Sequence, residues 1–142
     1  MLDPRVTIRD AAGDALIVQL TADGYTTDTA NRVVTNPDID TPRPYIQLNQ
    51  MSYQPWSTRT HEGANCRLTM VAVAETLTEA MTVAASIVSK LGRNLLTLDS
   101  PHETKMAWPE FTDEDANLEW RVGEIDYYGV VVRMRYHTME TG

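Results

Sequence analysis

The side chains that most often carry out chemistry are scattered along this chain. Its three histidines are His61, His102 and His137, and no two of them have the i, i+4 spacing that places zinc ligands on one helix face. The single cysteine, Cys66, excludes an internal disulfide and any multi-cysteine metal site. It lies in an alternating apolar segment, where a lone cysteine usually acts as a small hydrophobic residue. We therefore expect no metal site.

Motifs for nucleophilic catalysis and for cofactor binding are also absent from the sequence. There is no Gly-x-Ser-x-Gly motif and no glycine-rich phosphate loop. The acidic run Asp113, Glu114 and Asp115 lacks the alternating oxygen ligands and the central glycine of a calcium loop. We expect no catalytic residue and no cofactor, and we predict that the protein is not an enzyme.

The net charge of −8 is concentrated in one segment. Residues 99–126 contain nine acidic and two basic residues, which gives this segment a charge of −7. The rest of the chain is nearly balanced, so a wide basic groove for nucleic acid is not expected. The acidic segment is either a solvated loop or a functional surface that repels DNA or docks a basic partner. The candidates for that surface are Asp113, Glu114 and Asp115.

The sequence predicts two helices. The first follows Asp3 and Pro4, a capping residue and a residue suited to the first helical position, and its apolar residues recur at helical spacing up to residue 20. The second begins at the capping box formed by Thr76 and Glu79 and ends near Gly92. Between the first helix and the first long strand, residues 22–41 are rich in turn residues, with a short strand possible at 32–35.

Four longer segments alternate apolar and polar residues as strands do, at about residues 45–53, 64–74, 118–126 and 130–137. Their order with the helices is α-β-β-α-β-β. We predict an α+β fold in which an antiparallel sheet of about four strands carries two helices mainly on one face. One domain is expected over residues 1–142.

An extended hairpin arm is predicted near residues 54–63. Trp56 lies there outside any regular apolar pattern, and exposed aromatic residues flanked by polar residues and arginine are typical of protein interfaces. The alternative is a tryptophan folded back over the sheet edge. On the first reading, Trp56→Ala changes the stability of the monomer by less than about 1 kcal/mol. The candidate interface residues are Tyr53, Trp56, Arg59 and His61.

Three stretches of the chain resemble one known family. They are Pro44-Tyr45-Ile46-Gln47-Leu48, residues 64–74 followed by Thr78-Glu79-Ala80-Met81, and the closing run Tyr127-Tyr128-Gly129-Val130-Val131-Val132-Arg133-Met134-Arg135-Tyr136. Together with the opening helix and the length, they resemble the tail-terminator, or tail-completion, proteins of long-tailed bacteriophages and phage-derived particles. The resemblance covers most of the chain.

The resemblance implies a structural role in the virion. Such proteins form a homohexameric ring at the head-proximal end of the tail tube, stop its polymerisation and join the tail to the head connector. The implied partners are copies of the same chain, the tail tube protein and the head–tail connector protein, while DNA passes through without specific binding. No cofactor or catalytic residue is implied. Because no secretory signal or membrane-spanning apolar run is found, we expect assembly in the host cytoplasm.

Two alternatives to this role stay open. The nearest is another head–tail connector or a tail-tube subunit, because these proteins have similar sizes and patterns. The other is a dimeric α+β module that binds a small ligand, which predicts an apolar pocket between the sheet and the helices.

Overall fold

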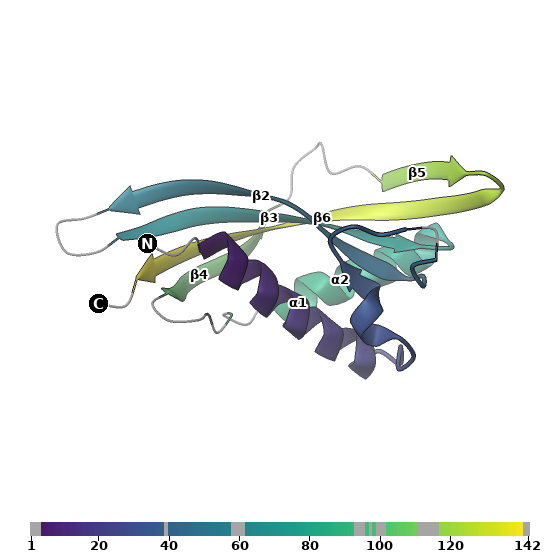
Figure 1. Ribbon diagram of the computed structural model, residues 1–142, viewed down its shortest axis with the longest axis horizontal. Coiled ribbons are helices and arrows are strands. Elements are labelled where there is room, and N and C mark those ends of the chain that lie inside the picture. Colours follow the sequence, from purple (N-terminus) through teal and green to yellow (C-terminus); the bar gives the residue numbers. More distant parts are fainter. Residues whose placement is uncertain are drawn as a thin grey trace.

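The computed structural model describes residues 4–38, 40–57, 62–92, 96, 98, 102–110 and 117–140. Two α-helices and six strands are found in these residues, together with one short 3-10 helix (Figure 1). In chain order the elements are α1 (Pro4–Ala22), η1 (Thr29–Arg32), β1 (Val33–Val34), β2 (Tyr45–Ser57), β3 (Glu62–Ala74), α2 (Leu77–Leu91), β4 (His102–Glu110), β5 (Asn117–Val122) and β6 (Ile125–Glu140).

Both helices form where the sequence predicts them. The α1 helix buries one apolar stripe completely or nearly so, formed by Ile8, Ala12, Leu16 and Leu20. At the start of α2, the Thr76 hydroxyl accepts a hydrogen bond from the Glu79 backbone N–H at 3.2 Å, which is half of the predicted capping box. Leu77 and Met81, which the helical pattern places in the buried stripe of α2, are exposed instead.

The strands form one sheet in the order β1-β2-β3-β6-β4, and β5 also pairs with β6. Only the pairing of β1 with β2 is parallel; all the other pairings are antiparallel. The β4 and β5 strands occupy successive stretches of one edge of β6, since β4 pairs with residues 133–140 and β5 with residues 125–130. The predicted α+β class with two helices is confirmed. The predicted sheet of about four strands, all antiparallel, and the order α-β-β-α-β-β are wrong, because the described residues form a sheet of six strands with one parallel pairing.

The error has a physical cause in the edge strands. The β4 strand falls in the acidic segment, where no strand is predicted before residue 118, because its charged residues and Pro109 interrupt any alternation of apolar and polar side chains. An edge strand tolerates both features, since one of its sides needs no hydrogen-bond partner. The short strand expected at residues 32–35 is present as β1, but two residues carry no signal for the direction of pairing.

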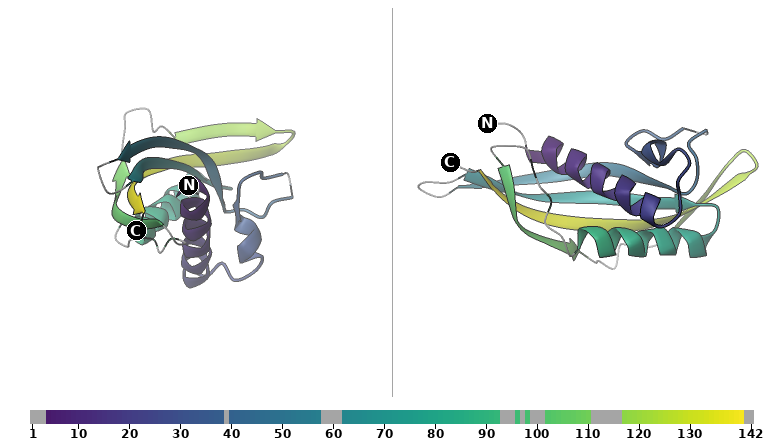
Figure 2. Two further views of the ribbon diagram at one scale, coloured as in Figure 1. Left: turned by 60° about the vertical axis from the view of Figure 1, so that its left-hand side comes forward. Right: turned by 90° about the horizontal axis from the view of Figure 1, so that it is seen from below.

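The main core lies between the sheet and the two helices, which cover the same face of the sheet as predicted (Figures 1 and 2). Cys66 contributes to this core as a fully buried side chain, in agreement with its predicted role as a small hydrophobic residue. The largest buried side chains contributed by β3 and β6 are Leu68, Met70, Met134 and Tyr136.

A second, smaller apolar cluster lies on the opposite face of the sheet. Its buried members are Tyr45, Val71, Val73 and Tyr127. Trp120 of β5 packs against this cluster and stacks on Tyr127, with ring centroids 5.4 Å apart and ring planes 6° apart. The β5–β6 hairpin is thereby attached to the sheet on the face that the helices leave uncovered.

Candidate interaction surfaces

Trp56 lies near the end of β2 and is packed across the sheet. It stands opposite Gly63 of β3 and stacks on His137 of β6, with ring centroids 4.8 Å apart and planes 1° apart. A Cβ atom on Gly63 would lie 2.3 Å from the indole ring, so only glycine leaves room for it. The indole is half-buried, and no described residue accepts a hydrogen bond from its Nε1. Trp56 therefore belongs to a regular strand and contributes to the packing of the monomer.

The other sequence-predicted interface residues are only partly described. Tyr53 lies on β2 in register with Cys66 of β3, so the structure places it on the same strand as Trp56. Arg59 and His61 lie outside the described residues, as does the connection from β2 to β3. A role of these residues in an interface stays a prediction.

The candidate acidic surface also lies outside the described residues. Asp113, Glu114 and Asp115 belong to the segment between β4 and β5. Its position relative to a ring lumen stays a prediction.

The outer edge of β2 is open over most of its length. The β1 strand pairs only with Ile46 and Gln47, and no other described strand pairs with the outer edge from residue 48 to residue 57. All 13 residues of β2 are uncharged. Natural edge strands are protected from further pairing by charged residues, proline or bulges. Between residues 48 and 57, β2 carries Pro55 and a bulge after Leu48 but no charged residue, so no charge opposes a partner on this edge.

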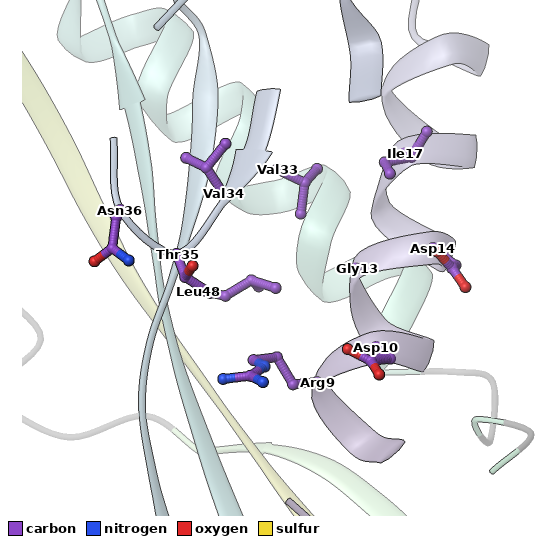
Figure 3. Close-up of a pocket in the computed structure, with 10 residues that line it drawn as sticks. All are labelled: Arg9, Asp10, Gly13, Asp14, Ile17, Val33, Val34, Thr35, Asn36 and Leu48. Atoms are coloured by element: carbon purple, nitrogen blue, oxygen red, sulfur yellow. The ribbon is translucent and has the colours of Figure 1, made fainter. Parts of the chain in front are cut away.

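A groove of about 640 Å³ lies beside this open edge, between α1 and the end of β1 (Figure 3). Val33 and Leu48 point into it from the sheet, and Arg9 extends into it from α1. The groove thus has an apolar base and a charged rim. The remaining lining residues are Asp10, Gly13, Asp14, Ile17, Val34, Thr35 and Asn36.

The β5–β6 hairpin forms a second candidate surface at the opposite edge of the sheet. Pairing of β3 with β6 ends at Tyr128, whereas β5 stays paired with β6 as far as Ile125, so the hairpin tip projects as two strands alone (Figure 1). Leu118 and Val122 of β5 are 42% and 47% exposed. Among the described strand residues, these two are the exposed large hydrophobic side chains.

Arg43 fixes the base of this hairpin. Its guanidinium lies 5.0 Å from the centroid of the Tyr127 ring, donates a hydrogen bond to the Asp126 carbonyl oxygen at 3.1 Å and forms an ion pair with Glu75 at 3.4 Å. Burial raises the pKa of the neighbouring Tyr45 phenol above its usual value, and Tyr127 raises it further, while Arg43 lowers it. The Tyr45 phenol therefore stays neutral at physiological pH and acts as a packing group.

The described part of the chain contains neither a cluster of metal-ligand side chains nor a helix suited to crossing a membrane. No three histidine, cysteine, aspartate or glutamate side chains there lie close enough together to hold a metal ion. Neither helix combines the length and the hydrophobicity that crossing a membrane requires.

Comparison with known proteins gives one family and one fold. The family model described as "Tail completion protein gp17" matches residues 14–135. A solved structure described as "Virion of native gene transfer agent (GTA) particle" contains a similar chain, with a TM-score of 0.65 and 18% sequence identity over 89% of this chain and 93% of that one. This similarity shows a shared fold. A search of curated proteins finds no significant match.

Proposed function

Because the chain belongs to the tail-completion protein gp17 family, we propose that it closes the head-proximal end of a phage-type tail tube as a ring of identical copies. The family is a structural component of virions, so the chain is a structural protein of the virion tail and not an enzyme. In the proposed ring, one face meets the last ring of tube protein and stops its growth. The other face meets the head connector, and DNA passes through the centre.

The observation that carries this proposal is the pair of unlike open edges on one sheet. The open edge of β2 lies on one side of the sheet, and strands β4 and β5 form the edge on the opposite side. When two different surfaces of the same chain bind each other, copies join head to tail, and the assembly closes into a ring if the rotation between them allows it. A sixfold closure is expected from the family resemblance.

The alternatives from the sequence are less well supported. A dimeric ligand-binding module predicts an apolar pocket between the sheet and the helices, but that space is filled by the buried core cluster. The groove of about 640 Å³ lies instead at the sheet edge and has a charged rim. A connector or tube subunit would use similar edges, and its position in the particle would distinguish it from a terminator.

Withholding the protein during particle assembly tests the proposed function. Without a terminator, tube subunits keep adding, so we expect overlong tails that lack heads in electron micrographs. Supplying the wild-type chain in trans should restore tails of normal length that carry heads. Tails of normal length joined to heads in the absence of the protein would overturn the proposal.

A further inference from the structure

We propose that the open edge of β2 and the groove beside it receive strand β5 of a second copy of this chain. The sheets of neighbouring copies then join edge to edge. This inference rests on the proposed ring and identifies the two surfaces that would build it.

The acceptor is a strand edge with unused main-chain hydrogen bonds. From residue 48 to residue 57 the outward N–H and C=O groups of β2 have no described strand beside them. An added strand would satisfy these groups, and no charged side chain of β2 would oppose it. Strand β4 fits an incoming edge less well, because its sequence carries the charged residues Glu103 and Lys105.

Gly13 keeps the groove beside this edge open. It lies within α1, where glycine destabilises a helix by about 1 kcal/mol relative to alanine. A Cβ atom at this position would lie 3.6 Å from Leu48 Cδ1 and 3.9 Å from Val33 Cγ1, which are ordinary contacts. Alanine is therefore tolerated sterically, whereas a larger side chain would fill the groove.

The position of strand β5 in the sheet suits pairing with the open edge of β2 in a second copy. It lies at the opposite edge of the sheet from β2 and belongs to the projecting hairpin (Figure 1). Contact between opposite edges is head to tail, as a ring requires. In a ring with rotational symmetry, each sheet face continues into the same face of the next copy.

The charges of β5 complement the groove. Leu118 and Trp120 point to the helix-free face, since their partners on β6 are Gly129 and Tyr127. Glu119 and Arg121 alternate with them, so these two side chains of the neighbour would face the groove. There Arg9 can pair with Glu119, and Asp10 can pair with Arg121. Arg121 forms an ion pair with Asp126 at 2.8 Å within its own chain, but both side chains are substantially exposed, so exchanging this partner costs little.

A cysteine pair tests the contact directly. The double variant Arg9→Cys with Glu119→Cys places one thiol in the groove (Figure 3) and one on β5, and native Cys66 is fully buried and does not interfere. In particles assembled with the variant we expect disulfide-linked multimers on non-reducing gels, up to the size of the closed ring. Each single variant should give monomers only.

A matched pair of variants tests the groove without cysteines. Gly13→Leu should fold, because leucine favours helix, but should lose at least tenfold in ring formation measured by native mass spectrometry. Gly13→Ala should form rings like the wild type.

The outcomes separate this inference from the proposed function. Rings that form without disulfide multimers, or rings that Gly13→Leu leaves intact, would overturn the pairing of β2 with β5 while keeping a ring-forming terminator. If the wild-type protein forms no ring in particles, the proposed function itself is wrong.

Discussion

Trp56 on β2 and His137 on β6 stack face to face across β3, with ring centroids 4.8 Å apart and planes 1° apart. The His137 Nδ1 atom also lies 2.7 Å from the Asn65 side-chain oxygen, which fixes the orientation of the imidazole on the sheet. The stack therefore joins the three longest strands near the tip of the β2–β3 hairpin.

Trp56→Ala should destabilise the monomer by about 2 kcal/mol, because it removes the stacked ring and the half-buried area beneath it. Urea denaturation measures this loss, and Trp56→Phe should recover most of it. This expectation replaces the small change predicted from the sequence. An unchanged denaturation midpoint for Trp56→Ala would show that the indole is free of the sheet and available for an interface.

Alanine substitutions at two glycines should have opposite effects on the free energy of unfolding. At Gly63 a Cβ atom would lie 2.2 Å from the Thr138 carbonyl oxygen and 2.3 Å from Trp56, so Gly63→Ala should cost about 2–4 kcal/mol. At Gly13 the contacts are ordinary, and Gly13→Ala should stabilise α1 by about 0.5–1 kcal/mol. Thermal unfolding of both variants checks the prediction, which fails if the two changes have the same sign.

Ionisation of the Tyr136 phenol should lower the free energy of unfolding above pH 10. Its side chain is fully buried, and burial raises the pKa of the phenol well above the usual value of 10. Below pH 10 both the folded and the unfolded states keep the Tyr136 proton, so Tyr136 contributes no pH dependence to stability there. Above it the unfolded state loses the proton first, and folding is disfavoured as pH rises toward the folded-state pKa.

Tyr136→Phe provides the control. The Tyr136 hydroxyl is buried and has no hydrogen-bond partner among the described residues, so its removal should be neutral or should stabilise by about 1 kcal/mol at pH 7. Urea midpoints at neutral pH and at about pH 11 should show a smaller loss for the variant than for the wild type. Equal losses would show that another group controls the alkaline transition.

The acidic segment can be tested by charge removal. If Asp113, Glu114 and Asp115 line the path of DNA, the triple variant Asp113→Asn, Glu114→Gln and Asp115→Asn should slow DNA release from particles at low salt. If these residues are solvated, as their charge predicts, the free energy of unfolding of the monomer should change by less than about 0.5 kcal/mol. A release rate that matches the wild type at every salt concentration would favour a solvated loop.

The sequence predicted the elements whose signals are local. The α2 helix was placed correctly because Thr76, Glu79 and Gly92 mark its ends. Strands β3 and β6 were found because their alternation reflects one face buried under the helices. These signals come from residues that are close together in the sequence, so they can be recognised without knowledge of the fold.

The features that the sequence did not reveal depend on distant partners. Strand β4 shows no alternation, and it is a strand only because β6 extends far enough to pair with it. From the sequence, Trp56 is predicted to lie on an extended arm. Its packing against Gly63 and His137 becomes evident only in the folded structure. The groove beside Leu48 could not be predicted either, because it depends on the packing of α1 against β1.

Imaging of the head–tail joint in assembled particles tests the central claim most directly. Electron cryomicroscopy with the chain carrying a small carboxy-terminal tag should show one ring of copies between the last tube ring and the head connector. Density for the tag repeated along the tube, or absent from the joint, would contradict a terminator.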